Sequence, residues 1–598
     1  MTAPSWKEVL PSPPPGGRLH EAWMTSFDQP DAGFLVEHLL PSLLGASHSL
    51  SQEFQERNLF FGELGTALEV LHGRLTVISS PPRDTREESQ YPWLWRYVSH
   101  FNVGSQARAV QHAKLWVFHW KVGDEEVLDL YVSSTNLTSA AFRSQLQAGW
   151  QATLPVVERA FQRTRQTWGE LVPFLEALGA SAGSIAAARL QRLVMLLGRA
   201  ECPAGVAFVA SVPGHRSAGR QLAEFEPSEI HVLTPSIGEW NQRTLAAWSS
   251  DVGVVPKKIH LKWISETHPW AATPGWALSN AASKSLQSSG VQIECLPKET
   301  RFTDHHRDGD PRWSHAKLYL LRSGRKRRLL VTSANWSTSA WGAGSSAPRN
   351  FELGVVFESE WSDLEALGES FDPPKSVPFC VDRADDTERF SPLEWAEASW
   401  DGKVITLLAR STDTVAPLSV VVTFTGRAQT NIPLEEGEGA MLWDDADRTP
   451  VAARFTQGAE ALEVDVLDLR PPSEFAKTAL PEVDPAVEQA LREAFLLQRY
   501  GGPVVDPESI PGLGNELGSR EAAALAGDYA VAAWIEARAA FGVVDQWRAA
   551  LEGAAAEPSR REQVYLDGEK LRTLFARREG PSALLVVEEL GWHLDEEA

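Results

Sequence analysis

The sequence predicts a chain of the α/β class, in which two similar α/β/α halves precede a small all-β domain and a helical C-terminal region. Three observations predict this architecture. Strand-like and helix-like segments alternate over the first part of the chain, and a motif with the same order of residues occurs twice there. Short alternating strands and then helical patterns fill the remainder. With 598 residues the chain is too long for one hydrophobic core, so several domains are expected.

The first half is predicted to cover residues 19–209. Segment 1–18 before it is rich in Pro and Gly and is predicted to be mobile. MTSFDQPDAGFLVEHLLPSLLG is typical of a strand entering a helix, with Asp31 as a candidate N-cap. LHGRLTVISS is strand-like and TREESQYPWLWRYVSH helical, and residues 155–200 have Ala, Leu and Arg at helical spacing.

The second half is predicted to cover residues 210–375. The run IHVLTPSIG, from Ile230 to Gly238, is typical of a strand that ends in a small loop rich in hydrogen-bond donors. Ser236 and the backbone amides near it can cradle a phosphate there, although an ordinary strand-to-helix turn has the same composition. A proline-rich segment, Asp372 to Phe379, marks the end of this half.

The rest of the chain follows different patterns. Residues 390–472 contain KVITLLAR, LSVVVTFTG, AMLWDD, VAARFTQ and LEVDVLDL, short strands that predict an antiparallel sandwich or small barrel. Residues 475–598 are predicted to be helical and carry no recognisable catalytic motif. This region is expected to dock either to a protein partner or to the other domains of the chain.

The net charge of −23 is unevenly distributed. Residues 381–598 carry 41 acidic and 20 basic residues, a net of −21, which leaves a net of −2 for residues 1–380. The acidic C-terminal region suits a protein partner. The nearly neutral motif-bearing part can focus positive potential in a cleft, but it has no broad basic face, which argues against tight non-specific binding of duplex DNA.

The sequence gives no sign of a membrane or a secretory setting. It has no apolar run of about 18 residues, and MTAPSWKEVLPSPPPGG lacks a secretory hydrophobic region. The three cysteines, Cys202, Cys295 and Cys380, have no metal-ligand spacing. We therefore expect a cytoplasmic protein without a disulfide framework.

One motif lies in WSHAKLYL and the RLLVTSANWSTSAWG that follows it. His315 and Lys317 stand two apart in a strand-like run, so their side chains are expected on the same face. The next strand delivers Ser333 and Asn335 just beyond its end, into a loop. These residue types suit a phosphodiester, because imidazole can attack phosphorus or protonate a leaving oxygen while Lys and Asn neutralise the other oxygens.

The same order of residues occurs earlier in the chain. QHAKLWVFHW contains His112 and Lys114, and LYVSSTNLTSAAF contains Ser134 and Asn136. A single H-x-K triplet arises by chance in many strands, where its residues are merely exposed. Two copies in the same order indicate half-sites that face each other across a pseudo-two-fold axis, with one histidine as nucleophile and the other as general acid.

The paired H-x-K…S-x-N pattern resembles the phospholipase D superfamily, and more closely its tyrosyl-DNA phosphodiesterase branch. The common superfamily motif has an Asp five residues after the Lys; here His119 and Arg322 stand at those positions, as in that branch. TSANWSTSAWG and FELGVVF are similar to the branch's second motif, with Glu352 at a supporting glutamate. NLTSAAFRSQLQAGW resembles its first motif, with Gln147 at a supporting glutamine. The resemblance covers roughly residues 20–370.

The resemblance implies a metal-independent phosphodiesterase that acts on nucleic acid, in particular single-stranded DNA or a DNA end, through a covalent phospho-histidine. In the family's order, His112 is the nucleophile and His315 the general acid and base, whereas the residues alone allow the reverse. Glu352 and Gln147 are expected to bind the other ring nitrogens of the histidines. The remaining predicted site residues are Lys114, Asn136, Lys317 and Asn335 as catalytic groups, and Ser134, Ser333 and Ser236 as phosphate ligands.

No cofactor and no metal are expected. A metal site in RFTDHHRDGDPR is conceivable because of His305 and His306, but adjacent histidines in a polar loop are usually solvated. Trp313 and Trp336 flank the second motif and are candidates either for stacking on a base or for core packing.

Three functions compete on the sequence. The first is removal of a blocking adduct from a DNA 3′ end, and the second is a nuclease of the same superfamily in defence against foreign nucleic acid. The third is a phospholipase or phosphatidyltransferase. The missing motif Asp residues and the lack of a membrane-binding amphipathic stretch argue against the third.

Overall fold

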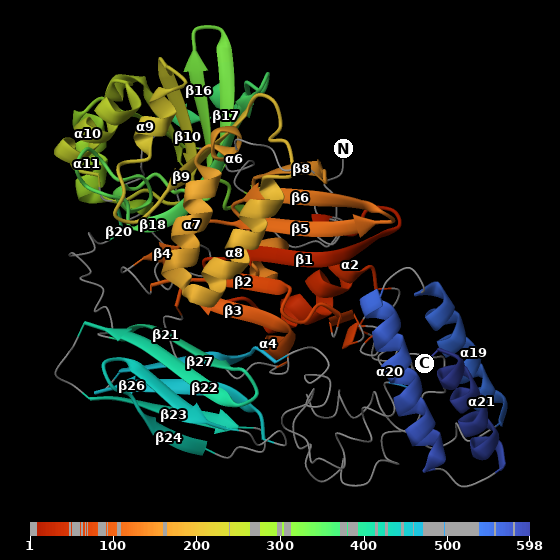
Figure 1. The fold of residues 1–598 in the computed structure, drawn as a ribbon. Helices are drawn as coiled ribbons and strands as arrows, with labels where there is room; N and C mark the ends of the chain where they lie inside the picture. Colours follow the sequence, from red (N-terminus) through yellow and green to blue (C-terminus); the bar gives the residue numbers. More distant parts are fainter. Residues whose placement is uncertain are drawn as a thin grey trace.

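The computed structural model describes most of the predicted motif-bearing part and portions of the remainder (Figure 1). The described residues are 9–46, 50, 60, 64–65, 67–68, 70–81, 91, 94–104, 109–158, 164–238, 240–263, 276–295, 302–303, 312–366, 368–370, 379–380, 393–412, 417–424, 429–443, 448–458, 460–470, 496, 537–554, 558–577 and 581–597. The mixed α/β class predicted from the sequence is confirmed.

The first sheet has six strands within the described residues, in the order β3-β2-β1-β5-β6-β8. They are β1 (Gly17–Thr25), β2 (Leu75–Ser79), β3 (Val98–Asn102), β5 (Leu115–Val122), β6 (Glu125–Ser133) and β8 (Gly149–Val156). The first three pair in parallel, and the last three extend the sheet in antiparallel pairs. Strands β2 and β3 are buried along their whole length, which requires cover on both faces.

Helices cover the two faces of this sheet, and alternate residues of β1 point to opposite cores. Trp23 packs in the core beneath α7 (Leu171–Ala182) and α8 (Ser184–Leu197), whereas Met24 packs in the core with α1 (Ala32–Phe34), η2 (Leu35–Leu39) and α2 (Leu40–Leu44). The shorter helices of this part are α4 (Leu94–Tyr97), α5 (Ser139–Arg143) and α6 (Thr164–Trp168). Asp31 caps α1 by accepting the Phe34 amide at 3.1 Å, as its position in the sequence predicted.

The second sheet has nine strands within the described residues, in the order β19-β13-β11-β10-β16-β17-β18-β4, with β9 also paired to β18. They are β4 (Val110–Gln111), β9 (Val206–Ser211), β10 (Glu229–Thr234), β11 (Ile259–Trp263), β13 (Gln292–Cys295), β16 (Leu318–Ser323), β17 (Lys326–Thr332), β18 (Asn350–Glu358) and β19 (Glu369–Ser370). Three parallel strands, β13-β11-β10, are again followed by three antiparallel ones, β16-β17-β18. The strand order of the first sheet therefore recurs.

Helices also pack on the second sheet. They are α9 (Gly219–Ala223), α10 (Gln242–Val252), η3 (Pro256–Lys258), α11 (Asn280–Ser288), α13 (Thr338–Trp341) and α14 (Asp363–Ala366). Side chains of α9, α10, α11 and α13 share one buried core with this sheet, and Leu364 of α14 belongs to a smaller core built on Leu320 and Leu329. A short ladder, β12 (Trp276–Ser279) with β20 (Phe379–Cys380), completes this part.

The two sheets exchange short strands where they meet. β4 comes from the first part of the chain but pairs in parallel with β18 of the second sheet. In the opposite direction, β7 (Gln145–Leu146) pairs with β15 (Arg312–Ser314), which also pairs with β14 (Phe302–Thr303). Each exchange lies directly beside one of the histidine motifs.

A seven-stranded sheet follows, in the order β24-β23-β26-β27-β21-β22-β25. Its strands are β21 (Leu393–Trp400), β22 (Val404–Ser411), β23 (Leu418–Phe424), β24 (Gln429–Pro433), β25 (Glu438–Leu442), β26 (Pro450–Gln457) and β27 (Glu460–Asp468). They enclose a separate core. The pairing of β21 with β27 is parallel, which the purely antiparallel expectation did not include.

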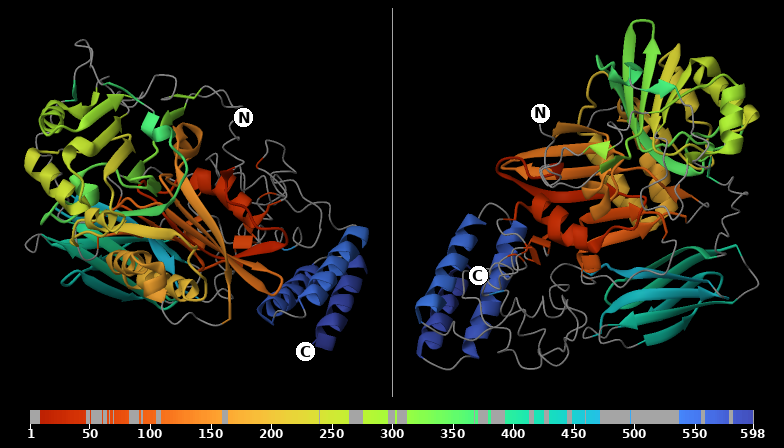
Figure 2. Two further views of the ribbon diagram at one scale, coloured as in Figure 1. Left: turned by 90° about the horizontal axis from the view of Figure 1, so that it is seen from above. Right: turned by 180° about the vertical axis from the view of Figure 1, so that it is seen from behind.

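The C-terminal helices are α19 (Ala537–Gly553), α20 (Pro558–Ala576) and α21 (Pro581–Glu597). Val543, Trp547 and Leu590 belong to the same hydrophobic core as Leu39 and Leu43 of the first part. The second sheet, the seven-stranded sheet and these helices all surround the first sheet (Figure 2). None of the helices in the described ranges is long and apolar enough to cross a membrane.

Three local expectations were wrong. β1 begins at Gly17 and the Pro11 carbonyl accepts the Ser42 hydroxyl at 2.8 Å, so the end of the predicted mobile segment 1–18 is packed on the protein. Residues 98–100, expected to be helical, belong to β3, and β9 starts the second sheet at Val206 rather than after residue 209. The predicted helices between 475 and 536 lie outside the described residues, except Leu496.

Candidate active site

Each H-x-K triplet lies in a short connection that leads into a strand, and not within the strand as expected. Residues 112–114 precede β5, and residues 315–317 precede β16. In both copies the lysine folds back onto the histidine two residues earlier. Nζ of Lys114 lies 2.7 Å from the carbonyl oxygen of His112, and the corresponding distance in the second copy is 2.9 Å. The ammonium group of each copy is therefore fixed beside its imidazole.

The S-x-N residues follow the next strand, β6 or β17, as predicted. One backbone hydrogen bond in each copy brings this segment to the lysine: Ser133 N donates to Lys114 O at 3.0 Å, and Thr332 N donates to Lys317 O at 3.2 Å. Asn136 and Asn335 lie in the loops just beyond. The structure thus places histidine, lysine and asparagine of each copy at one end of its sheet.

Each histidine is held by a side chain that belongs to the other sheet's motif. His112 Nδ1 lies 2.8 Å from Oε2 of Glu352, and His315 Nδ1 lies 3.2 Å from Oε1 of Gln147. The backbone amide of each histidine also donates to the carbonyl of the residue just before its support, at 3.0 Å and 2.8 Å. The exchanged strands β4 and β7 create these crossed contacts.

The serines stand behind these supports. The hydroxyl of Ser134 donates to Oε1 of Gln147 at 2.6 Å, and that of Ser333 donates to Oε2 of Glu352. Both serines are fully buried. In this structure their protons orient the supporting side chains, so their role as phosphate ligands stays a prediction.

The amide of Gln147 has a defined orientation. Its Nε2 donates to Oε1 of Gln145 at 2.6 Å, which leaves Oε1 to face His315 Nδ1. Glu352 is likewise fixed by Asn350, whose Nδ2 donates to its second oxygen at 3.0 Å. With Nδ1 of His112 bound to an acceptor, its Nε2 is the ring nitrogen left for chemistry. Nε2 of His315 lies 3.1 Å from Nζ of Lys317, which would also be close to a phosphate bound there.

Burial keeps both imidazoles neutral. It lowers the pKa of His112 below the usual value, against the opposing charge of Glu352. It lowers the pKa of His315 further, together with the charges of Lys317, Lys114 and His112. A neutral His112 is the form that can attack phosphorus.

The two lysines share the same buried space. Burial lowers the pKa of Lys114 to about 8, and burial together with Lys114 places the pKa of Lys317 well below its usual value. For Glu352, burial opposes ionisation, but His112 and Lys114 hold its pKa below the usual range. A phosphate anion between the lysines would stabilise their charged forms.

Sequence reasoning missed the loop after β1. The Phe27 ring lies edge-on to His112, with centroids 4.9 Å apart, and its amide donates to Oδ1 of Asn136 at 3.1 Å. Asp28, whose residue is exposed, accepts a hydrogen bond from Nδ2 of Asn136. Its negative charge acts to raise the pKa of Lys114, against the effect of burial. The order of strands in the sheet explains why this loop reaches the site, because β1 pairs with β5, the strand that directly follows the first H-x-K triplet. No local sequence motif indicates that pairing.

The loop of Ser236 lies against the second motif. Thr234 Oγ1 lies 2.8 Å from the carbonyl oxygen of Ser236 and 3.3 Å from Oδ1 of Asn335. A Cβ on Gly238 would lie only 2.4 Å from Cβ of Ser337, so glycine is required by this close approach. The Ser236 side chain itself is exposed, and its binding of phosphate stays a prediction.

Trp336 does not stack on a base in this arrangement. Its side chain is fully buried, with ring centroids 5.1 Å from Trp240 and 5.8 Å from Trp248. The core-packing alternative is therefore the correct one for this residue. The side chain of Trp313 and the His305–His306 pair lie outside the described residues.

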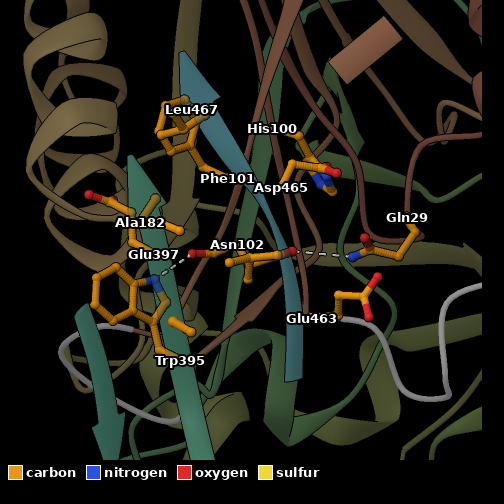
Figure 3. Close-up of a pocket in the computed structure, with 13 residues that line it drawn as sticks. Gln29, His100, Phe101, Asn102, Ala182, Trp395, Glu397, Glu463, Asp465 and Leu467 are labelled. Carbon is orange, nitrogen blue, oxygen red and sulfur yellow. Dashed lines mark hydrogen bonds between the residues drawn. The ribbon is translucent and has the colours of Figure 1, made fainter. Parts of the chain in front are cut away.

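A separate hollow lies where the seven-stranded sheet meets the first sheet (Figure 3). It is lined in part by His100, Asn102, Glu397, Glu463 and Asp465. Nε1 of Trp395 donates to the carbonyl oxygen of Asn102 at 3.1 Å. Gln29, in the loop after β1, donates to the side-chain oxygen of Asn102 at 3.2 Å. This contact connects the seven-stranded sheet to the loop that reaches the active site.

Comparison with known families gives one match, to the tyrosyl-DNA phosphodiesterase family model over residues 257–393. The matched residues include the second motif, His315 to Asn335, and Glu352. Over these residues the chain is similar to the tyrosyl-DNA phosphodiesterase family. The resemblance found from the second motif is confirmed over this stretch.

Among solved structures, yeast tyrosyl-DNA phosphodiesterase is 17% identical at a TM-score of 0.39, with 59% of this chain and 85% of that chain covered. A variant of the same yeast enzyme is 16% identical at a TM-score of 0.40, with 59% and 86% covered. Polyphosphate kinase from Porphyromonas gingivalis is 12% identical at a TM-score of 0.27, with 60% and 43% covered. No curated protein matches the sequence.

Proposed function

We propose that the chain is a metal-independent DNA phosphodiesterase that removes a blocking adduct, such as a tyrosyl group, from a DNA 3′ end. The observation that carries the proposal is the crossed pair of neutral histidines, each with Nδ1 bound to a support and with a lysine beside it. The family match to tyrosyl-DNA phosphodiesterase supports DNA as the substrate. The recurring strand order supports two pseudo-symmetric phospholipase D-like halves.

In the first step, Nε2 of His112 attacks phosphorus in line and the bond to the leaving oxygen breaks. The positive charge that develops on the imidazole is stabilised by Glu352, which already accepts its Nδ1–H. His315, protonated when the substrate phosphate is bound, gives its Nε2 proton to the leaving oxygen. The product of this step is a phospho-histidine on His112 and a free leaving group.

In the second step, the now neutral His315 takes a proton from water. The water oxygen attacks phosphorus and the bond between phosphorus and Nε2 of His112 breaks, which restores both imidazoles. Lys114, Lys317 and the two asparagines stabilise the negative charge on the other phosphate oxygens in both steps. Glu352 carries the negative charge that stabilises an imidazole bonded to phosphorus, and the order of the family's motifs gives His112 the same role.

The test is to trap the covalent intermediate. His315→Asn is expected to accumulate a phospho-enzyme with an aryl phosphodiester, because a phenolate leaves with little protonation while no base remains to activate water. His112→Ala is expected to form none. Intact-mass measurement after mixing detects the adduct directly. An adduct found only in His112→Ala would reverse the roles, and normal turnover by both variants would place the active site elsewhere.

The substrate is tested separately with two DNA probes. An oligonucleotide with a 3′-tyrosyl group is expected to be converted to the 3′-phosphate, whereas an unmodified single strand is expected to remain intact. Internal cleavage of the plain strand as the faster reaction would instead support the nuclease alternative.

Independence of metals follows from the residues, because two histidines and two lysines supply the acid, the base and the positive charge that a metal would otherwise provide. Hydrolysis of the aryl phosphodiester is therefore expected to survive excess EDTA. Complete loss of activity that a divalent ion restores would contradict the mechanism.

A further inference from the structure

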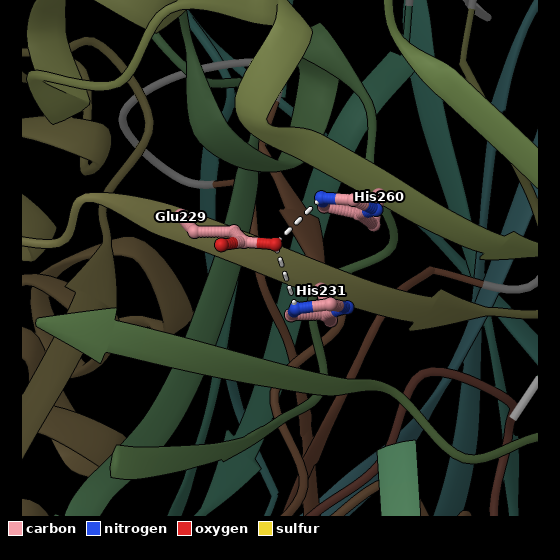
Figure 4. A group of neighbouring side chains, drawn as sticks. All are labelled: Glu229, His231 and His260. Atoms are coloured by element: carbon pink, nitrogen blue, oxygen red, sulfur yellow. Dashed lines mark ion pairs between the residues drawn. The ribbon is translucent and has the colours of Figure 1, made fainter. Parts of the chain in front are cut away.

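Outside the active site, three potential metal ligands meet on the second sheet (Figure 4). Glu229 and His231 lie two residues apart on β10, so their side chains emerge on the same face. His260 lies on the neighbouring strand β11 and is the direct register partner of His231. Parallel pairing in this register places the two imidazoles side by side, with ring centroids 4.4 Å apart and an interplanar angle of 16°.

The polar atoms of the three residues converge on one point. Nε2 of His260 lies 2.7 Å from Oε1 of Glu229, and Nε2 of His231 lies 3.4 Å from the same oxygen. One ligand atom from each residue lies within 4.8 Å of the others. Figure 4 shows one ring nitrogen of each histidine directed toward the carboxylate of Glu229.

His231 is the residue that calls for an explanation. Its side chain is 5% exposed, and neither ring nitrogen has a hydrogen-bond partner among the described residues. Burial lowers its pKa to about 4, with the charges of His260 and Lys262 acting in the same direction. A buried polar group without a partner is costly, and such groups in native structures usually serve a purpose.

We propose that Glu229, His231 and His260 form a binding site for a divalent transition-metal ion, with zinc as the best fit. Two imidazoles and one carboxylate are a ligand set that zinc takes, with the fourth position open to water. Ligand atoms in such a tetrahedral site are roughly 3.4 Å apart. Nε2 of His231 already lies 3.4 Å from Oε1 of Glu229, and Nε2 of His260, at 2.7 Å, moves slightly away from that oxygen to admit the ion. The metal accepts the lone pair of His231 that nothing else engages.

The surroundings of this site suit a bound cation in two respects. Oε1 of Glu294 lies 3.6 Å from Nδ1 of His260, so its negative charge favours the tautomer with the proton on Nδ1 and the lone pair on Nε2. Lys262 is paired with the other oxygen of the same carboxylate, so its charge is compensated. Nη1 of Arg322 lies 3.6 Å from Oε2 of Glu229. The Arg322 side chain is 43% exposed, so it can move into solvent when a metal binds.

The ion would act on stability and not on the chemistry. It joins β10 to β11 three residues before Thr234, whose hydroxyl contacts Asn335 of the second motif. Bound metal therefore stabilises the pair of strands from which the loop after Thr234 extends, while the histidine mechanism proceeds without the metal. The inference is independent of the proposed function.

The test uses the full chain, stripped with chelator and dialysed against zinc or cobalt(II). Wild-type protein is expected to retain one metal equivalent more than Glu229→Gln or His231→Asn, by elemental analysis, because the catalytic histidines can also take up metal and only the difference is diagnostic. Cobalt is expected to give a visible absorption typical of tetrahedral nitrogen ligation that both variants reduce. His215→Asn, at an exposed histidine, serves as the matched control and is expected to behave like wild type.

Thermal unfolding supplies the second readout, because a ligand that binds only the folded state raises its melting temperature. Zinc is expected to raise the melting temperature of wild type and of His215→Asn and to leave that of Glu229→Gln nearly unchanged. Glu229→Gln keeps the volume of the side chain, which guards against a folding defect. Equal metal uptake and equal shifts in wild type and Glu229→Gln would overturn the proposal.

Discussion

The two histidines that we propose as catalytic differ in the charge of the group that holds them. A carboxylate binds Nδ1 of His112, whereas a neutral amide binds Nδ1 of His315. A carboxylate stabilises an imidazole as it becomes positive, which happens to the nucleophile on attack and to the acid before it gives up its proton. The sequence contained both supports, but only the crossed contacts determine which histidine each one serves.

Glu352→Gln is expected to lower the rate of phospho-enzyme formation by about 10²–10⁴-fold, because the amide keeps the hydrogen bond to His112 but removes the charge. Single-turnover measurement of adduct formation checks this. Gln147→Ala is the comparison, since it is expected to affect the hydrolysis step through His315. If Glu352→Gln slowed only hydrolysis of the adduct, the roles of the histidines would be exchanged.

Asp28 places a negative charge where a substrate phosphate has to arrive. Its carboxylate accepts from Asn136 Nδ2 and acts on Lys114 and Lys317, the groups that the phosphate needs. Asp28→Asn is therefore expected to lower KM by about two- to ten-fold, with little change in kcat. Steady-state kinetics measures this, with Asp28→Glu as the charge-preserving control. A raised KM would mean that the carboxylate binds substrate instead.

At the scale of elements, the loop between β10 and α10 is fixed by contact with the second motif. Gly238→Ala would put a Cβ 2.4 Å from Cβ of Ser337, at the N-cap of α13, so the loop must move. We expect a loss of about 1–3 kcal/mol in stability and a higher KM, because Thr234 then loses Asn335.

Denaturant unfolding and kinetics test that substitution. The matched control is Gly553→Ala in α19, where nothing lies within 4 Å of an added Cβ and alanine favours the helix. That variant is expected to be as stable as wild type or slightly more stable. A Gly238→Ala protein with unchanged stability and KM would show that the loop is not held by this contact.

Most strands that carry the site could be predicted from the sequence, because β10, β16 and β17 have strong apolar patterns between clear turns. The errors have physical reasons. β3 follows α4 without a break, so the helical pattern was continued through Val98. β9 was joined to the wrong half because its partner, β18, lies far away in the sequence. Asp28 went unnoticed for the same reason, since its place in the site depends on strand pairing and not on a local motif.

At the scale of the whole molecule, the seven-stranded sheet carries a buried carboxylate in the hollow where it meets the first sheet. Glu397 is 7% exposed, and its Oε2 has no partner among the described residues. Burial raises its pKa to about 7. The folded state thus holds a proton that the unfolded state releases, so this group's contribution to stability falls as the pH rises from about 4.5 toward 7 and is constant above.

Glu397→Gln is expected to stabilise the protein at pH 8, by up to about 3 kcal/mol, because the ionised buried carboxylate is replaced by a neutral amide. The advantage is expected to shrink toward pH 5, where the wild-type carboxyl is protonated in the folded state. Denaturant unfolding at the two pH values measures it, and Glu463→Gln, at another acidic residue that lines the same hollow, is the control. A benefit that did not change with pH would contradict this account.

The exchanged strands β4 and β7 also bear on what a fragment of this chain can do. A piece that contained only the first sheet would keep His112 and the support of His315, and a piece with only the second sheet would keep His315 and the support of His112. Neither fragment would contain a histidine together with the side chain that supports it, so each fragment is expected to be inactive alone. Activity that returned on mixing the two fragments would therefore show directly that they had reassembled.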